Sequence, residues 1–203
     1  MFGNIYKGKN ILITGNTGFK GSWLSYWLLK LGANVSGFSL TPNTNPNHFS
    51  ILNLEYETFF NNINDLQELK KVIKKTSPEI IFHLAAQPLV RYSYINPIET
   101  IQTNVLGTAN VLEAARLNKN VKAIVVVTTD KCYENNEKGI SFVESDSMGG
   151  YDPYSSSKGC AELITSAYRN SFFNLDKFEK SHDTLIATPP AHKNGSGTRF
   201  SAP

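Results

Sequence analysis

The chain has 203 residues, which is enough to bury a sizeable core in one large domain. Hydrophobic residues make up 40% and charged residues 18%, so disorder over most of the chain is excluded. The formal net charge is +3, and the basic residues do not gather in the stripe that nucleic-acid binding would leave, so we expect no nucleic-acid partner.

Membrane and extracellular locations are not expected either. No run approaches the roughly 18 apolar residues of a membrane span, and residues 1–4 lack the basic and then apolar layout of a signal peptide. Cys132 and Cys160 have neither the spacing of zinc ligands nor that of a disulfide framework, so we expect reduced thiols that pack or have no role. These features predict a cytoplasmic protein without a membrane partner.

In chain order, the first predicted elements are a strand, a turn and a helix. Residues 10–14 are a short apolar, β-prone run that ends in Gly15, as a buried parallel strand would. From residue 19 to residue 31, large apolar residues recur at helical spacing, and Gly32 supplies a stop. Residues 33–40 follow as a second strand, and a loop rich in Pro and Asn covers residues 41–47.

The alternation of strands and helices continues to about residue 172. We expect helices at 65–75, 97–117 and 155–172, strands at 80–84 and 123–127, and a third strand that ends near residue 62. Such alternation predicts an α/β fold: a doubly wound (Rossmann) parallel sheet with helices on both faces. Residues 175–203 show no sustained period, so we expect a disordered tail after a dinucleotide-binding domain at 1–174.

Three glycines at a spacing of three stand between the first strand and the first helix. Gly15 permits the tight turn, Gly18 lets the backbone approach a pyrophosphate, and Gly21 allows the helix to pack closely on the strand. The helix N-terminus then faces the anion with free N–H groups. Three glycines also occur in ordinary turns, but the strand before them and the amphipathic helix after them favour a dinucleotide site.

The residues alone do not decide between NAD and NADP. Residues 37–40, at the end of the second strand, offer neither the carboxylate that binds a ribose diol nor an arginine for a 2′-phosphate. Asn62 and Ile63 could hold the adenine; alternatively, they are a strand end that precedes a helix cap at Asn64.

A Tyr-x-x-x-Lys pair places an ammonium one helical turn from a phenol, where it favours the phenolate that a base for hydroxyl oxidation requires. The spacing occurs twice, at Tyr26 and Lys30 and at Tyr154 and Lys158. The first pair lies in the helix behind the glycine loop, where we expect a solvated surface pair. The second opens a helix near the carboxyl ends of the strands, where open α/β sheets bind ligands, so it is the predicted catalytic pair.

Polar residues directly follow the most β-prone strand. Thr128, Thr129, Asp130 and Lys131 bring two hydroxyls, a carboxylate and an ammonium to the end of this strand. They are either a polar strand exit with a solvated ion pair or the third corner of one site with the glycine loop and the tyrosine helix. His83 ends another strand without a second metal ligand at suitable spacing, so no metal is expected.

These motifs resemble the extended short-chain dehydrogenase/reductase family and, within it, the sugar-nucleotide 4,6-dehydratases that act on CDP-glucose. The likeness covers about residues 5–174 and is carried by segments 14–24, 83–91, 103–108, 128–133 and 149–158. The glycine loop and the Tyr/Lys pair mark the broad family. The motifs Phe-Lys-Gly-Ser-Trp at 19–23 and Thr-Thr-Asp-Lys at 128–131 are typical of a much smaller group within that family.

The resemblance implies a lyase of polysaccharide biosynthesis that uses NAD and regenerates it in each cycle. A hydride leaves C4 of the hexose for NAD while Tyr154, with its pKa lowered by Lys158, takes the hydroxyl proton, and Thr128 or Thr129 positions that oxygen. A base then removes the C5 proton of the 4-keto sugar and an acid protonates the departing 6-hydroxyl. The hydride finally returns to C6.

The resemblance also implies the remaining site residues. Asp130 would be the acid and Lys131 the base of the elimination, and Arg91 and Thr129 would contact the substrate. The residues implied for the cofactor are Gly15, Asn16, Thr17, Gly18, Phe19, Gly21, Asn62, Ile63, Leu84, Ala85, Ala86, Gln87, Asn104, Thr128, Tyr154 and Lys158. Two alternatives stay open: an NAD-dependent epimerase or reductase, which would not need Asp130 and Lys131, and an inactive NAD-binding remnant.

The end of the chain departs from the family. Family members continue past the tyrosine helix into further strands and a small domain for the sugar nucleotide, whereas residues 175–203 match nothing in the family. We therefore expect a truncated chain whose sheet lacks its last strands and exposes an edge prone to aggregation. Helices 97–117 and 154–172, which pair subunits as a four-helix bundle in this family, leave a homodimer open.

Overall fold

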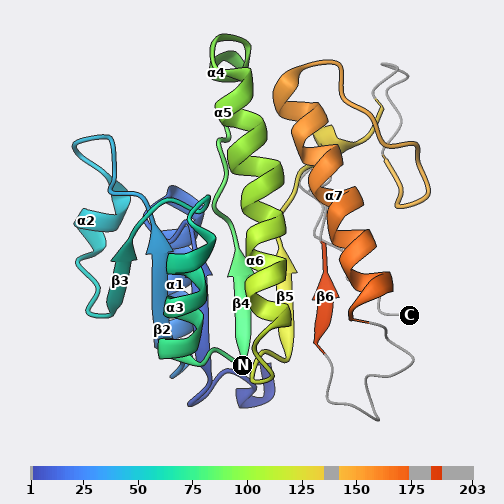
Figure 1. Cartoon of the computed structure of the whole chain (residues 1–203). Coiled ribbons are helices and arrows are strands. Elements are labelled where there is room, and N and C mark those ends of the chain that lie inside the picture. Colours follow the sequence, from blue (N-terminus) through green and yellow to red (C-terminus); the bar gives the residue numbers. More distant parts are fainter. Residues whose placement is uncertain (1, 135–141, 174–183, 189–203) are drawn as a thin grey trace.

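The computed structural model describes residues 2–134, 142–173 and 184–188. Its centre is a sheet of six parallel strands in the order β3-β2-β1-β4-β5-β6 (Figure 1). This is the strand order of a doubly wound dinucleotide-binding fold, so the predicted fold class is confirmed. The strands are β1 (Asn10–Thr14), β2 (Asn34–Ser39), β3 (Glu57–Phe60), β4 (Ile80–His83), β5 (Ala123–Val126) and β6 (Leu185–Ala187).

Helices flank both faces of the sheet. In Figure 1, α3, α6 and α7 lie in front of the strands and α1 lies behind them. The α-helices are α1 (Phe19–Lys30), α2 (His48–Leu52), α3 (Leu66–Thr76), α4 (Val90–Ile95), α5 (Pro97–Ile101), α6 (Gly107–Arg116) and α7 (Pro153–Ser171). A π-helical turn at Gln102–Leu106 joins α5 to α6 without a break. The helix predicted at 97–117 is therefore continuous, with a π-helical turn inside it. None of the described helices combines the length and the apolar character that a membrane crossing requires.

Alternate residues of the central strand β1 face different cores. Leu12 packs in a large cluster that includes Leu69 of α3, while Ile11 and Ile13 pack with Leu28 of α1 on the other face of the sheet. All five side chains are almost completely buried. Burial on both faces explains why this strand is a continuous apolar run in the sequence, and it supplies the hydrophobic driving force that holds the helices to the sheet.

The central strands end together at one edge of the sheet. Thr14 of β1 pairs with Phe38 of β2 and with His83 of β4, and His83 pairs with Val126 of β5. The loops that follow these strands therefore leave the sheet side by side. In an open α/β sheet, this carboxyl edge is where ligands bind.

The start of α7 is fixed by its first residues. Pro153 occupies the first turn, where its missing N–H costs nothing, and Asp152 caps the helix by accepting a hydrogen bond from the Ser155 nitrogen at 3.0 Å. The Tyr154 nitrogen donates to the buried Ser93 hydroxyl of α4 at 3.2 Å. These contacts hold the first turn of α7 at the carboxyl edge of the sheet.

The structure corrects several expectations from the sequence. Strand β6 comes from segment 175–203, so the expectation of a disordered tail is wrong there, and the described sheet has a sixth strand beside β5. Helices α2 and α4 lie where no helix was predicted, and α3 is capped by Asp65, which accepts from the Glu68 nitrogen at 2.9 Å, and not by Asn64. The rest of the expected tail, 175–183 and 189–203, lies outside the described residues.

Candidate active site

The loop between β1 and α1 brings backbone very close to its neighbours. Gly15 has a φ of +74°, in the left-handed region, and a Cβ there would lie 2.7 Å from the Ala85 nitrogen. A Cβ at Gly21 would lie 2.1 Å from the Gly15 oxygen, so only glycine lets α1 approach the loop this closely. A Cβ at Gly18 would meet only the Gly15 oxygen, at 3.3 Å, which leaves that side of the loop open. No side chain caps α1 and no acidic residue stands in its first turn, so its N-terminus suits an anion.

Two side chains of this loop anchor it to the sheet. Asn16 is buried, and its amide donates to the Tyr56 and Thr58 hydroxyls of the β3 region, both at 3.0 Å. Thr17 donates to the Leu40 carbonyl just beyond β2, at 2.9 Å. The side chains of Asn16 and Thr17 therefore fix the shape of the predicted cofactor loop.

Tyr154 and Lys158 lie one turn apart on the buried face of α7, and both are buried. A hydrogen bond joins the Tyr154 side chain to Thr129, so the strand exit and the tyrosine helix meet. The competing pair is on α1, where the Lys30 ammonium lies 5.6 Å from the centre of the Tyr26 ring and Lys30 is exposed. The described structure thus gives the two pairs the different surroundings that the sequence predicted.

The residues after Thr129 form a short 3-10 turn, Asp130–Cys132. The Thr129 hydroxyl donates to the Asp130 carboxylate at 3.0 Å and accepts from the Lys131 nitrogen at 3.4 Å. Asp130 is half-buried and its charge acts on the Tyr154 phenol, whereas Lys131 is exposed. The structure therefore brings Asp130 to the predicted site and leaves the Lys131 side chain at the surface.

The Tyr154 phenol is held in its neutral form by its surroundings. Burial raises the pKa of Tyr154, the hydrogen bond with Thr129 opposes the rise, and the carboxylates of Asp130 and Asp152 add to it. The expected lowering of this pKa by Lys158 is therefore wrong in this structure. The reason is that desolvation and two nearby negative charges disfavour the phenolate.

The Lys158 ammonium is destabilised by its surroundings. Burial lowers the pKa of Lys158 to about 8, the carboxylate of Glu162 opposes this, and the ammonium of Lys20 adds to it. Lys20 is an exposed residue within the three-glycine motif, so the glycine loop and α7 place two positive charges within reach of each other. Sequence reasoning missed Lys20, although its position inside the motif was a usable signal.

A chain of buried polar side chains links β1, β4, α6 and α7. The His83 ring is hydrogen-bonded to the Thr14 hydroxyl at 2.7 Å and to the Thr108 hydroxyl at 3.1 Å. Thr108 donates to the Asn104 carbonyl at 2.7 Å, and the Asn104 amide donates to the Ser157 hydroxyl at 2.8 Å. Buried polar groups that are all satisfied in this way fix one arrangement of the elements that carry them.

Asn104 and Gln87, both implied for the cofactor, are bound to each other. The Asn104 oxygen accepts from the Gln87 nitrogen at 2.8 Å, and the Asn104 amide donates to the Gln87 carbonyl at 3.1 Å. The Gln87 amide donates in turn to the Thr100 hydroxyl at 2.9 Å. Their side chains therefore shape the loop that follows β4.

His83 and Cys132 are titratable groups whose burial favours their neutral forms. Burial lowers the pKa of His83 to about 3, and the charge of Lys158 adds to the effect. Burial also raises the pKa of the Cys132 thiol to about 12. Within residues 2–134, 142–173 and 184–188, no group of three or more metal-binding side chains is found.

The remaining predicted residues are spread around this edge. Ile63 is buried against α6, where a Cβ at Gly107 would lie 2.7 Å from Ile63 Cγ2, and Asn62 accepts from the Asn64 nitrogen at 2.9 Å. Strand β3 ends earlier, at Phe60, so the two residues lie between β3 and α3, and their use for the adenine stays a prediction. Leu84, Ala85 and Ala86 follow β4, Phe19 is exposed at the start of α1, and Arg91 is exposed on α4.

A buried carboxylate that sequence reasoning missed completes the site. Thr128 donates a hydrogen bond to Glu162, so of the two threonines considered for the substrate oxygen, Thr129 meets Tyr154 and Thr128 meets Glu162. Burial raises the pKa of Glu162, while hydrogen bonds with Thr128 and Thr188 oppose the rise. The available signal was its spacing, because Glu162 follows the predicted lysine by one helical turn.

Known proteins resemble this chain in sequence and in fold. The family model described as GDP-mannose 4,6 dehydratase matches residues 12–175. CDP-glucose 4,6-dehydratase of Salmonella typhimurium is 48% identical over 196 residues, which cover 96% of this chain and 55% of that protein. A solved epimerase of Methanothermobacter thermautotrophicus has a TM-score of 0.75 at 30% identity and covers 91% of this chain and 52% of its own. UDP-glucose 4-epimerase of Thermus thermophilus, solved as a complex with NAD, has a TM-score of 0.70 at 27% identity, over 80% of this chain and 51% of its own.

The lengths of these matches bear on the end of the chain. The chain spans about half the length of the relatives it matches. The Salmonella protein matches 96% of the chain, which is more than residues 1–174 contain. The expectation that residues 175–203 match nothing in the family is therefore wrong for part of that segment, in line with the strand β6 found there.

Proposed function

Because the chain belongs to the GDP-mannose 4,6 dehydratase family, we propose that it forms the cofactor-binding and catalytic part of a sugar-nucleotide 4,6-dehydratase, a lyase that acts on CDP-glucose. The observation that carries the proposal is the meeting of Thr129 with Tyr154 at the carboxyl edge of the sheet, with Lys158 one turn away. The choice of CDP-glucose rests on the relative of that name at 48% identity. The product would be CDP-4-keto-6-deoxyglucose.

The cofactor proposed is NAD. The glycine loop fits a pyrophosphate because Gly18 leaves one side of the loop open and α1 begins there without a capping side chain. A relative with the same fold was solved as a complex with NAD. When bound, NAD supplies a hydride acceptor for C4 and later the hydride donor for C6. The glycine-loop backbone, the Ala85 region and Lys158 would hold it.

Oxidation at C4 gives Tyr154 and Thr129 their roles. The C4 carbon loses a hydride and its hydroxyl loses a proton, and the Tyr154 oxygen is the group that takes this proton. Thr129 is bonded to that same side chain and would orient the substrate hydroxyl beside it. A positive charge at Lys158 then favours the negative oxygen, against the burial that disfavours it.

Elimination of water gives Asp130 and Lys131 their roles. The C4 ketone acidifies the C5 proton, Lys131 would remove that proton, and Asp130 would protonate the departing 6-hydroxyl, which leaves as water. A hydride returned to C6 and a proton returned to C5 complete the product, so the net change is the loss of one water. Asp130 already lies in the site, whereas the exposed Lys131 side chain has to turn toward it.

The test measures the product and the cofactor separately. Protein, CDP-glucose and NAD are mixed, and the alkali-induced absorbance of a 4-keto-6-deoxy sugar is followed. The 203-residue chain itself is expected to bind NAD with weak or no turnover, and a longer protein that carries this sequence is expected to turn over. Tyr154→Phe should abolish the product, and Tyr26→Phe is the matched control because it changes the other tyrosine of the same spacing. No product from the longer protein overturns the dehydratase proposal.

An NAD-dependent epimerase or reductase is the second candidate, favoured by the epimerases among the solved structures of this fold. Such an enzyme would keep the 6-hydroxyl of the sugar. Mass spectrometry of the same reaction separates the two, because only a dehydratase product is lighter by one water. A chain that binds NAD and turns over nothing, in either length, would be the inactive remnant.

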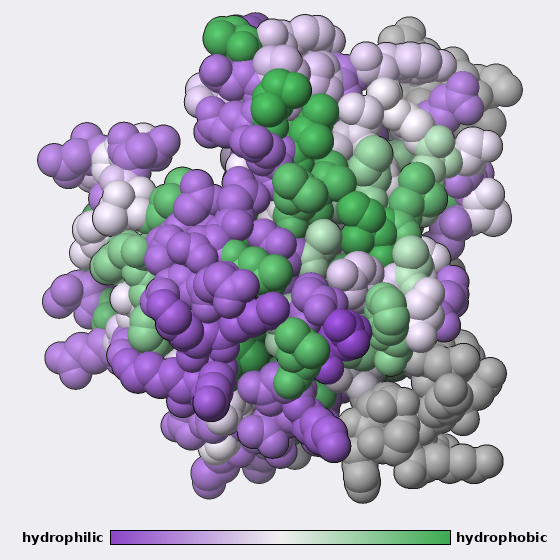
Figure 2. Space-filling view, in the orientation of Figure 1, coloured by the Kyte–Doolittle hydropathy of each residue, from purple (hydrophilic) through white to green (hydrophobic). Residues whose placement is uncertain are grey.

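A homodimer through α5, α6 and α7 is proposed for the quaternary structure. Figure 2 shows hydrophobic side chains along α5 and α6, and Ile98, Ile101, Leu106 and Leu163 are exposed on α5, α7 and the π-helical turn. We expect Leu163→Glu to convert the dimer to a monomer in sedimentation equilibrium. Ile51→Glu, a similarly exposed apolar position on α2, is the control and should leave the assembly unchanged. A monomeric parent chain contradicts this proposal.

The proposed location is the cytoplasm, and the proposed context is polysaccharide biosynthesis. Both are inferred from the proposed activity on a nucleotide sugar. Fractionation of cells that express the chain, followed by immunodetection, checks the location.

A further inference from the structure

A carboxylate is buried directly behind the predicted catalytic pair. Tyr154, Lys158 and Glu162 follow one another at four-residue spacing on the buried face of α7. Lys158 is 7% exposed and Glu162 is 6% exposed. Charged side chains are almost never buried this far unless they are paired or have a role.

The contacts of Glu162 lead to both neighbouring strands. Thr128, at the exit of β5, donates a hydrogen bond to the Glu162 carboxylate. Thr188, directly after β6, shares a second hydrogen bond with it. Thr128 immediately precedes Thr129, the residue that is bonded to Tyr154. The carboxylate is therefore tied to the same strand exit that contacts the phenol.

We propose that Glu162 is a positioning residue of the catalytic site: the negative charge of its carboxylate favours the buried Lys158 ammonium one helical turn away, and through Thr128 it fixes the strand end that carries Thr129. The consequence for catalysis rests on the proposed function, whereas the link between Glu162 and Lys158 does not. Glu162 touches neither reacting atom in this scheme and acts through its two neighbours.

The charges around the two groups come from four elements. Lys158 is influenced by Glu162 on its own helix, by Lys20 on α1 and by Cys132 in the 3-10 turn, and it acts in turn on His83 of β4. Glu162 is also influenced by Arg169, further along α7. Among the groups that act on Lys158, the Glu162 carboxylate is the leading one that favours the charged lysine. Removing its charge should therefore shift Lys158 toward the neutral amine.

The experiment is a titration of Lys158 in the 203-residue chain without cofactor. Lysine labelled with carbon-13 is followed by NMR across pH, and Lys158→Met identifies its signal. In Glu162→Gln, which keeps the size of the side chain and removes the charge, we expect the Lys158 midpoint to fall from about 8 by about one pH unit, a tenfold loss of the charged form. Glu162→Asp, which keeps the charge, should restore most of the midpoint. Glu113→Gln, which removes a carboxylate paired with Arg116, should leave it unchanged.

Two further outcomes decide the proposal. If Glu162→Gln does not fold, Thr128→Val tests the same link, because loss of the donated hydrogen bond weakens the carboxylate and should move the Lys158 midpoint in the same direction by a smaller amount. A folded Glu162→Gln chain with an unchanged Lys158 midpoint overturns the proposal and leaves Glu162 as a helix-to-strand contact only. NAD titrations on the same proteins test the proposed function separately: a parent chain that does not bind NAD refutes that function without altering the Lys158 result.

Discussion

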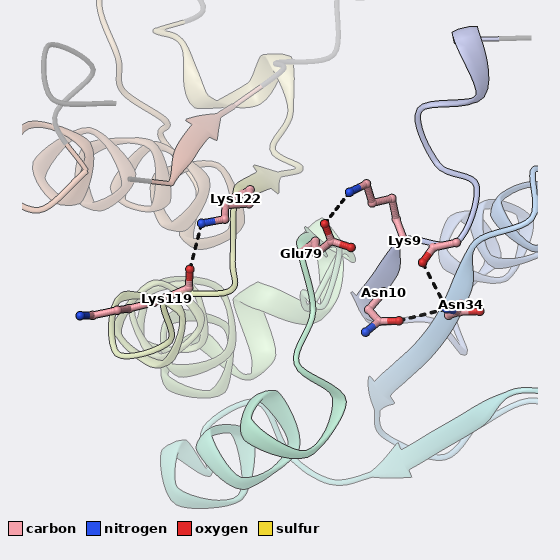
Figure 3. Close-up of polar contacts among 7 residues, drawn as sticks. Lys9, Asn10, Asn34, Glu79, Lys119 and Lys122 are labelled. Carbon is pink, nitrogen blue, oxygen red and sulfur yellow. Dashed lines mark hydrogen bonds and ion pairs between the residues drawn. The ribbon is translucent and has the colours of Figure 1, made fainter. Parts of the chain in front are cut away.

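The two ends of the parallel sheet hold their polar side chains in different ways. At the amino ends of the strands, Lys9 donates to Glu79 at 2.6 Å and Asn34 donates to Asn10 at 3.1 Å (Figure 3). These contacts lie near the surface, with the Lys9 and Glu79 side chains 43% and 34% exposed. At the carboxyl ends, many polar side chains, His83, Asn104 and Glu162 among them, are buried and hydrogen-bonded across several elements, although Lys131 there is exposed.

This difference concerns the free-energy cost of burying charged groups, which is larger at the carboxyl ends of the strands. An exposed ion pair keeps its water and contributes little. Buried charged groups lose their contact with water. Burial lowers the pKa of Lys158 and raises the pKa of Glu162, so both neutral forms are favoured. A fold that needed only stability could place apolar side chains there. The perturbed groups therefore support the proposal that the active site lies at the carboxyl edge of the sheet.

The largest effect is expected at the glycine loop. Gly21→Ala puts a Cβ 2.1 Å from the Gly15 oxygen, and because both sides are backbone, α1 has to move away from the loop. We expect the free energy of unfolding to fall by about 3 kcal/mol, measured by urea denaturation.

The matched control lies in the same loop. Gly18→Ala meets only one atom, at 3.3 Å, so we expect a change in the free energy of unfolding of less than about 1 kcal/mol together with a marked loss of NAD affinity. The pair separates the packing role of one glycine from the ligand-contact role of the other. A Gly21→Ala protein as stable as the parent would contradict the packing role of Gly21.

The next effect concerns His83. Its pKa of about 3 keeps the ring neutral in the folded chain, whereas an unfolded histidine takes up a proton near pH 6.5. Below pH 6.5 the unfolded state therefore binds more protons, and stability falls as the pH drops toward 3, by up to about 1.4 kcal/mol per pH unit. His83→Asn should flatten this acid limb and cost about 2 kcal/mol at neutral pH, because the bond to Thr108 is lost.

Urea unfolding at a series of pH values measures both effects. His48→Asn is the control, because it removes a histidine that is only half-buried and bonded to the Ser22 hydroxyl at 2.7 Å. An acid limb in His83→Asn as steep as in the parent chain would show that other groups dominate the pH dependence.

Lys158 connects burial to the proposed cofactor. The ammonium is present below its pKa of about 8 and is lost above it, so NAD affinity should fall as the pH rises through 8. Lys158→Met should bind NAD about tenfold more weakly at neutral pH, or about 1.4 kcal/mol, and should lose this pH dependence. Lys30→Met removes the lysine of the exposed pair on α1 and should bind as the parent does. Equal affinities in the two variants would contradict the choice between the two Tyr/Lys pairs.

The sequence predicts the local elements better than the long-range contacts between them. The glycine loop and the α/β elements around it follow from local spacing, and the structure has these elements. The choice of Tyr154 over Tyr26 came from the place of each pair in the predicted fold, because the spacing itself occurs twice, and it stays a prediction. Strand β6 did not follow, because three apolar residues show no period and its order comes from pairing with the distant β5. Glu162 was missed for the same reason, since its contact with Thr128 joins residues 34 positions apart.

The smallest effect belongs to the amino end of the sheet. Glu79→Gln removes the ion pair with Lys9 but keeps the backbone contacts of residue 79, in which its nitrogen donates to the Asn10 carbonyl at 2.8 Å. Because the pair is partly exposed, its Coulomb energy is screened by water and offset by the ordering of two long side chains. We expect the free energy of unfolding to change by about 0.5 kcal/mol or less, with a smaller change at high salt, and the NAD affinity to stay the same. A loss above about 1.5 kcal/mol would mean that the amino end is as tightly coupled as the carboxyl end, and burial would then no longer distinguish the functional edge from the structural one.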